Sequence, residues 1–206
     1  MNILPVLFLA AATSAMAQGS ATTMAAGFIG RENLPFHRWF GRVAKARTTR
    51  ILLDSMTDSI EVREAVLADA PEIIRLFALL GHTQPAGDDT ARLGAFLDHG
   101  QHVLVASRPA TEPGTALLGA VTLHITPVLH RAGPVGRLTA VIVDESTRGR
   151  GVGGALVSAA EDFLAAHGCA LIEITSNKKR TDAHAFYERL GYIATSVRFA
   201  KPLPND

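Results

Sequence analysis

The stretch at residues 139–157, TAVIVDESTRGRGVGGALV, decides the fold prediction. It opens with an apolar run at residues 140–143, passes through a polar turn, and then places two arginines and four glycines within residues 148–154. An apolar helical pattern follows. Glycines let backbone N–H groups crowd around an anion, a helix start adds partial positive charge, and arginines add full charges. This junction of a strand and a helix therefore predicts a phosphate-binding loop.

Two other kinds of phosphate-binding loop can be compared with this one. A Walker-type loop needs Gly-Lys-Ser/Thr at its end, whereas this chain continues with GVGGAL. Gly149, Gly151 and Gly154 do spell the G-x-G-x-x-G of dinucleotide-binding proteins, with Glu173 about 20 residues further on. However, a polar turn separates the strand from the first glycine, and too few β-α-β units follow for a doubly wound sheet. A dinucleotide oxidoreductase stays an alternative.

Charge is distributed unevenly along the 206 residues, whose formal net charge is +1. Residues 1–55 hold six Lys/Arg and two Asp/Glu, so the remainder is mildly acidic. An acidic main domain has no electrostatic reason to bind DNA or RNA, and we expect no nucleic-acid partner. The single cysteine excludes an intrachain disulfide.

The N-terminus carries conflicting signals. Residues 1–18, MNILPVLFLAAATSAMAQ, end in an Ala-Met-Ala sequence like a signal-peptidase site, but no Lys or Arg precedes the apolar core. That core is too short to span a membrane. Residues 36–53 are basic and interrupted by apolar residues, which fits a targeting or membrane-surface segment, and Met24 or Met56 could instead be the true start. We expect an N-terminal extension at residues 1–55, a domain at residues 56–206 and a cytoplasmic location, with export as the alternative.

From residue 56 the chain shows regular patterns. Apolar alternation and apolar runs predict strands at residues 60–65, 102–107, 116–125, 137–143, 169–175 and 192–200. Helical spacing predicts a helix capped by Asp69 and ended by Gly81, and further helices near residues 90–99, 152–166 and 181–190. Hairpins give antiparallel pairs and the β-α-β crossover gives a parallel pair. The order predicts an α/β domain with a mixed sheet.

Two motifs carry a resemblance to a known family. RGRGVG at residues 148–153 resembles the Gln/Arg-x-x-Gly-x-Gly/Ala loop of the GNAT N-acetyltransferase superfamily. NKKRTDAHAFYERLGY at residues 177–192 resembles its second signature, an Asn followed by a helix with Phe-Tyr and then a Gly-aromatic pair. The resemblance covers residues 60–199. It implies a single domain with a mixed, mostly antiparallel central sheet flanked by helices.

The resemblance also implies acetyl-CoA as cosubstrate and no metal. The strand before the loop would hold the pantetheine arm and the acetyl carbonyl, the loop would hold the pyrophosphate, and an Asn would bond the pantetheine amides. The residues at these positions are Val141, Ile142, Val143, Arg148, Gly149, Arg150, Gly151, Val152, Gly153, Gly154 and Asn177.

Proton transfer would involve different side chains. Family members often use a tyrosine to protonate the CoA sulfur, and Tyr187 matches that position on an inward helix face; a packed tyrosine is the alternative. Many relatives carry a glutamate base where this chain has Thr139, which cannot accept a proton at neutral pH. His124 on the neighbouring strand, a water chain, or an amine that arrives neutral are the alternatives.

The resulting functional prediction is an N-acetyltransferase that transfers the acetyl group of acetyl-CoA to a primary amine of a small molecule or protein by direct attack. The main rival is a non-catalytic acyl-CoA-binding or sensory module of the same fold, which the missing glutamate favours. We expect an amine acceptor as partner and no stable membrane span. A homodimer is possible from the family resemblance alone.

Overall fold

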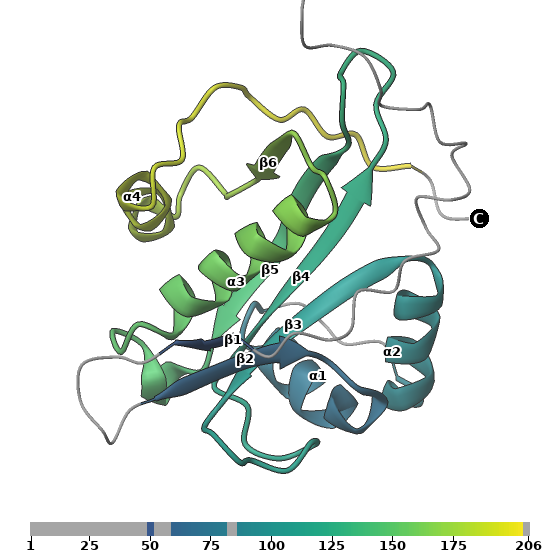
Figure 1. Ribbon diagram of the computed structural model, residues 1–206, viewed down its shortest axis with the longest axis vertical. Helices are drawn as coiled ribbons and strands as arrows, with labels where there is room; N and C mark the ends of the chain where they lie inside the picture. The colour runs from purple at the N-terminus through teal and green to yellow at the C-terminus, as the bar shows by residue number, and fades with distance from the viewer. Residues whose placement is uncertain (1–48, 52–58, 82–85, 204–206) are drawn as a thin grey trace, which may run out of the picture. The chain divides into compact units, whose positions relative to one another are not determined.

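The sheet of the computed structural model, which describes residues 49–51, 59–81 and 86–203, contains six strands in these ranges. They lie side by side in chain order (Figure 1). Their bounds are β1 (Thr49–Ile51), β2 (Ile60–Glu64), β3 (Gln101–Ser107), β4 (Gly119–Thr126), β5 (Val135–Val143) and β6 (Leu171–Ile174). Each neighbouring pair from β1 to β5 is antiparallel, and β5 with β6 is parallel. The predicted mixed, mostly antiparallel sheet is confirmed.

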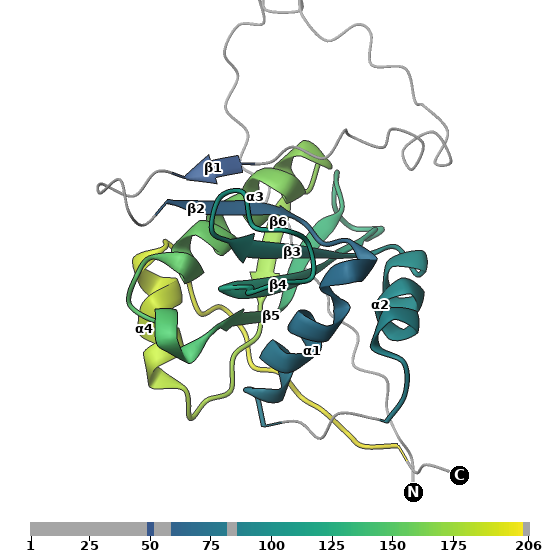
Figure 2. The ribbon, with the colours of Figure 1, turned by 90° about the horizontal axis from the view of Figure 1, so that it is seen from below.

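Helices cover both faces of the sheet. They are α1 (Ala70–Ala78), α2 (Asp89–Asp98), α3 (Val152–Ala166) and α4 (Thr181–Arg189), with short 3-10 turns η2 (Leu67–Asp69) and η3 (Glu145–Thr147). The parallel pair β5–β6 requires a crossover, and α3 supplies it. Figure 2 shows α1 and α2 together on one side of the strands.

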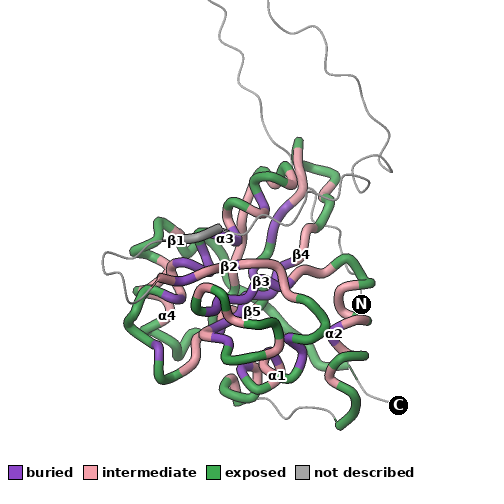
Figure 3. The backbone as a smooth tube through the Cα atoms, turned by 60° about the horizontal axis from the view of Figure 1, so that its bottom comes forward, coloured by how far each residue is buried: buried purple, intermediate pink, exposed green. Residues whose placement is uncertain are grey.

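Strand β3 shows how the two faces differ. Val103 and Val105 pack into the cluster formed with α1 and α2, whereas Leu104 and Ala106 pack into the cluster formed with α3. Successive side chains of a strand point to opposite faces, so a strand buried on both sides is apolar throughout. Figure 3 shows the resulting buried residues along the central strands.

The crossover helix α3 packs on the sheet through an apolar face, part of which lies over a glycine of β5. Val152, Leu156, Ala160 and Leu164 recur at helical spacing and are all buried. A Cβ on Gly136 of β5 would lie 2.7 Å from the Leu164 side chain. A side chain at position 136 would therefore force the Leu164 side chain to move.

Asp69 precedes α1 as predicted, but its carboxylate does not cap the helix. It is fully buried, and it accepts bonds from Arg63 at 2.7 and 2.9 Å and from the amides of Val66 and Gly114. Burial alone would raise the pKa of Asp69, but these four hydrogen bonds outweigh it and lower the pKa. The carboxylate joins β2 to the loop before β4 instead of capping the start of α1.

The prediction of a final strand at residues 192–200 is wrong. These residues form neither helix nor strand, and Ile193, Val197 and Phe199 are 81%, 59% and 92% exposed. Alternating apolar residues satisfy the strand pattern, but a strand also needs a hydrogen-bonded neighbour. Among the described strands, β6 pairs only with β5.

Most of the predicted N-terminal extension lies outside the described residues, including the signal-like segment and both alternative start positions. All the described residues belong to one structural unit, residues 44–206, and the boundary at residues 55/56 stays a prediction. None of the helices in the described ranges is long and apolar enough to cross a membrane.

Candidate active site

The loop between β5 and α3 is anchored at its start. The Asp144 amide donates to the Leu118 carbonyl at 2.9 Å, and the Thr147 hydroxyl donates to the same oxygen at 3.3 Å. The Asp144 carboxylate accepts from the Ser146 hydroxyl at 2.6 Å and from Arg75 of α1 at 2.7 Å. Bonds from Ser146 and then from Arg75 lower the pKa of Asp144 to about 2. The loop is thus tied to the residue that precedes β4 and to α1.

The glycine-rich part of the loop presents free backbone amides. Gly149 and Gly151 have φ of +78° and +81°, a conformation that suits glycine, and Gly151 is the residue immediately before α3. Within residues 49–51, 59–81 and 86–203, the amides of Gly149 and Gly151 have no hydrogen-bond acceptor. The first amides of any α-helix also lack an intrahelical acceptor. This arrangement fits an anion held at the start of α3, as the sequence predicts.

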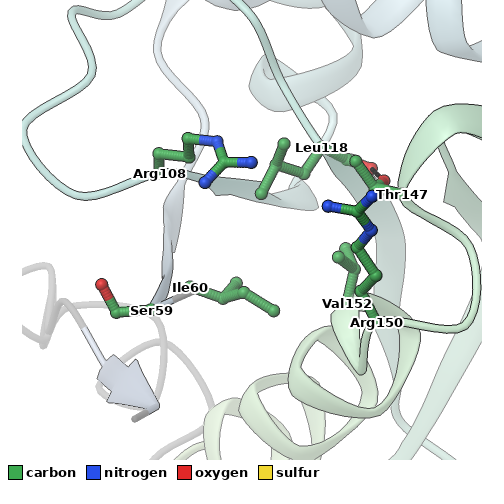
Figure 4. Close-up of a pocket in the computed structure, with 7 residues that line it drawn as sticks. All are labelled: Ser59, Ile60, Arg108, Leu118, Thr147, Arg150 and Val152. Atoms are coloured by element: carbon green, nitrogen blue, oxygen red, sulfur yellow. Dashed lines mark hydrogen bonds between the residues drawn. The ribbon is translucent and has the colours of Figure 1, made fainter. Parts of the chain in front are cut away.

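The arginines of the loop are exposed, so they are accessible to a bound anion. Among the described residues, the Arg148 side chain pairs only with Glu145, at 3.4 Å. The Arg150 guanidinium is directed toward a small cavity, which Arg108 faces from the other side (Figure 4). That cavity has a volume of about 10 Å³, room for roughly one water molecule. It is too small to be the ligand site.

The other predicted loop residues contribute in different ways. Val152 is buried, so its side chain belongs to the core and only its backbone faces the loop. A Cβ on Gly153 would lie 3.3 Å from Phe186 of α4, whereas a Cβ on Gly154 would meet nothing within 4 Å. Glycine at position 153 therefore leaves room for the Phe186 side chain of α4 to pack against the start of α3.

Strands β5 and β6 separate beside this loop. Their pairing runs from Val135 with Leu171 to Leu138 with Ile174 and then stops, although β5 continues to Val143. The far half of β5 therefore has no strand on its β6 side among the described residues. Its predicted pantetheine-binding residues divide between the faces: Val141 and Val143 pack partly against the α3 cluster, and Ile142 is buried in the other.

A β-bulge lies at the point of separation. Leu138 pairs with Leu123 while Ala140 pairs with Thr122, so Thr139 is the extra residue. The Thr139 and Thr122 hydroxyl oxygens are 2.7 Å apart. Thr139 is exposed, at the position where the resemblance implies a glutamate base.

Helix α4 brings Tyr187 to the same region, since the preceding residue, Phe186, lies beside Gly153. Tyr187 is half-buried, and burial raises its pKa, although Arg180 opposes the shift. No hydrogen-bond partner of its hydroxyl is found among the described residues. A protonated hydroxyl without a partner can donate to a ligand, as the predicted general acid must.

Asn177 has a structural role in its loop. Its Oδ1 accepts from the Lys179 amide at 2.9 Å, which is a turn contact, and its carbonyl accepts from the Arg180 amide. The side chain is exposed, and its amide nitrogen has no partner within the described ranges. A bond from that nitrogen to pantetheine stays a prediction.

His124 lies on β4 directly opposite Arg137 of β5, and Arg137 in turn donates to Glu173 of β6 at 2.8 Å. Burial, and then the charge of Arg137, lowers the pKa of His124, which keeps the imidazole neutral near pH 7. Sequence reasoning missed Arg137. It also considered Glu173 only as the acidic residue of the dinucleotide-binding pattern, whereas the mostly antiparallel sheet excludes a doubly wound dinucleotide fold.

Among the described residues, no group of three or more His, Cys, Asp or Glu side chains is placed to hold a metal ion.

Comparison with known proteins agrees with this geometry. Residues 69–192 match the Acetyltransferase (GNAT) family. The chain is 37% identical over 87 residues to an aminoalkylphosphonate N-acetyltransferase of Salmonella typhimurium, an alignment that covers 42% of this chain and 56% of that protein. It is 29% identical over 142 residues to a glucosamine 6-phosphate N-acetyltransferase of Trypanosoma brucei brucei, covering 68% and 94%.

A solved structure gives the same result for the fold. A putative acetyltransferase from Agrobacterium tumefaciens superposes with a TM-score of 0.61 at 26% identity, covering 69% of this chain and 99% of that one. The family resemblance predicted from the two motifs is confirmed, and with it the class of acyltransferase. The chain belongs to the acetyltransferase (GNAT) family.

Proposed function

We propose that this protein transfers the acetyl group of acetyl-CoA to a primary amine. The observation that carries the proposal is the separation of β5 from β6 after Leu138 and Ile174, directly beside a glycine loop with free amides. This combination offers two sets of unpaired backbone groups, one for an anion and one for an extended amide-containing chain. CoA has both parts.

The residues present fit this cosubstrate. The positive φ at Gly149 and Gly151 turns loop amides outward without a side chain in front of them, and Arg148 and Arg150 add exposed charge. Residues 148–154 would hold the pyrophosphate. The backbone of residues 141–143 would hold the pantetheine arm, with a further bond from Asn177.

Bound acetyl-CoA would supply a thioester carbonyl open to attack by an amine. The backbone amides of β5 beyond the bulge would bond the carbonyl oxygen as it gains negative charge. Tyr187 would give the proton of its hydroxyl to the departing sulfur, because its raised pKa keeps that proton in place at neutral pH. The neutral imidazole of His124 would take the proton that the amine loses.

The acceptor class follows from the relatives. Those named above act on an aminoalkylphosphonate and on glucosamine 6-phosphate, both small molecules. We propose a small-molecule amine as the acceptor, in preference to a protein amine.

A non-catalytic acyl-CoA-binding module is the second candidate, because Thr139 stands where many relatives have a glutamate. The free hydroxyl of Tyr187 favours catalysis. The two functions are separated by mixing the protein with acetyl-CoA and a panel of amines and measuring thiol release. Amine-dependent thiol release supports the enzyme, whereas acetyl-CoA binding with no release for any amine supports the binding module.

A further inference from the structure

A row of polar side chains crosses the sheet next to the point where β5 and β6 separate. Gln101 pairs with His124, His124 with Arg137, and Arg137 with Glu173, so all four lie on one face of four consecutive strands. Four residues further along β3 and β4, the same face is apolar, with Val105, Ala120 and its partner Ile142 buried against α1 and α2. The polar row is a part of this face that is not fully buried, since Arg137 is exposed and the other three residues are partly exposed.

The row lies close to the proposed reaction site. Arg137 and Glu173 form the register pair just before Leu138 and Ile174, the last pair before the strands part. At about 3.3 Å per residue, the α-carbons of Arg137 and Ala140 are roughly 10 Å apart along β5. An arginine side chain shortens that gap, so one small molecule can touch both the guanidinium and the amides beyond the bulge.

The Arg137–Glu173 ion pair can exchange its partner. Its side chains are 48% and 39% exposed, and a pair this exposed contributes little to stability. Only Nη2 of the guanidinium donates to Glu173, which leaves further N–H groups of the fork. Guanidinium groups bind carboxylate and phosphate oxygens in bidentate fashion, so an acid group is the ligand for which this side chain is suited.

We propose that Arg137 is the acceptor-specificity residue and that it selects amines carrying an acid group, with Glu173 holding the guanidinium when no acceptor is bound. His124 stands on the other side of Arg137, where the proton of the bound amine can reach it. The proposal rests on the proposed function, because it assigns the acceptor for the same reaction site.

The test compares matched amines. O-phosphoethanolamine is paired with ethanolamine, and β-alanine with n-propylamine, in steady-state assays with saturating acetyl-CoA. We expect kcat/KM at least about 10-fold higher for the acid member of each pair. In Arg137→Gln the KM for the acid members rises roughly 10- to 100-fold, while the neutral members change less than about 2-fold. Comparing kcat/KM for O-phosphoethanolamine and β-alanine shows whether a phosphate or a carboxylate is preferred.

Three controls make the result specific. Arg137→Lys keeps the positive charge but loses the bidentate geometry of the guanidinium, and we expect it to retain part of the preference for acid-bearing amines. Arg198→Gln makes the same chemical change at an exposed residue of the C-terminal segment and should leave the preference intact. The affinity for acetyl-CoA should be unchanged in Arg137→Gln.

Two results would overturn the proposal. One is equal kcat/KM for the acid and neutral members in the wild type; the other is an equal loss for both members in Arg137→Gln, which would mean a structural role. Calorimetric titration of O-phosphoethanolamine into the wild type and Arg137→Gln decides the subsite even if no amine is acetylated. If no amine is acetylated but O-phosphoethanolamine binds the wild type and not Arg137→Gln, the acid-binding subsite is supported and the proposed function is rejected. If O-phosphoethanolamine does not bind the wild type, the subsite is rejected.

Discussion

The rings of Tyr187 and Tyr192 lie 5.9 Å apart, edge to face, yet only the Tyr192 hydroxyl has a hydrogen-bond partner among the described residues. Tyr192 donates to Glu161 of α3 at 2.9 Å. Burial, and then that hydrogen bond, raises the pKa of Tyr192. The two neighbouring tyrosines therefore differ in role. Tyr192 bonds to α3, whereas the Tyr187 hydroxyl is available to a ligand.

This contrast predicts different effects for two conservative substitutions. Tyr187→Phe should lower kcat roughly 10- to 1000-fold, because one proton donor is lost, with little change in acetyl-CoA affinity. Tyr192→Phe should instead lower the free energy of unfolding by about 1 kcal/mol and keep kcat, because only its bond to Glu161 is lost. Steady-state kinetics and urea denaturation of both variants check this. An unchanged kcat in Tyr187→Phe would remove Tyr187 from the mechanism.

The loop conformation gives a second matched pair. Gly151 and Gly100 have φ of +81° and +70°, so Gly→Ala at either position should cost about 1 kcal/mol of stability through backbone strain. Only Gly151→Ala should also raise the Kd for acetyl-CoA, since residue 100 lies between α2 and β3, away from the loop. Calorimetry on both variants measures this difference. If both weaken binding equally, the loop has no special role.

The role of His124 predicts a dependence on pH. His124→Gln should lower kcat/KM roughly 10- to 100-fold at pH 8, because a proton acceptor is lost. The folded pKa of His124 lies below its usual value, so the imidazole stays neutral until the pH falls through that lower pKa. The ratio of wild-type to variant kcat/KM should therefore approach one in acid. A ratio that stays constant with pH would mean that His124 does not accept the amine proton and that water does.

The buried Asp69 makes a prediction about stability. Asp69→Asn should cost about 3–5 kcal/mol, because Arg63 and two amides lose a buried charged partner. Asp182→Asn, whose pair with Arg180 is exposed, should cost less than about 1 kcal/mol. Urea denaturation at pH 7 compares them, and equal costs would contradict the account.

The same carboxylate predicts a direction with pH. The folded pKa of Asp69 is lowered, so its contribution is fully present above the unfolded value of about 3.9 and is lost as the pH falls through the folded pKa. The stability difference between wild type and Asp69→Asn should therefore shrink below about pH 4. A difference that does not change between pH 7 and pH 3 would contradict this.

The sequence predicts most of the fold because the signals are local. The helix start at Val152 and the glycine loop follow from spacing and composition alone. The final strand could not be excluded in the same way, because the pattern at Ile193, Val197 and Phe199 is that of a strand and only the missing neighbour differs.

The residues of the candidate site also differ in whether a local sequence pattern reveals them. The loop residues and Tyr187 lie within short motifs, so they could be found in the sequence. Arg137 could not, because its place beside His124 and Glu173 depends on the register of three strands and on a bulge at Thr139. Pairing between residues 36 positions apart leaves no local pattern.

The central claim is that the loop and the separated strands bind acetyl-CoA. The most direct test is calorimetric titration of acetyl-CoA and, separately, NADH into the full chain, with Gly151→Trp as the control. We predict acetyl-CoA binding in the micromolar range, no binding of NADH, and loss of acetyl-CoA binding in the variant. No acetyl-CoA binding by a folded wild-type protein would contradict the account and leave the loop with another anion.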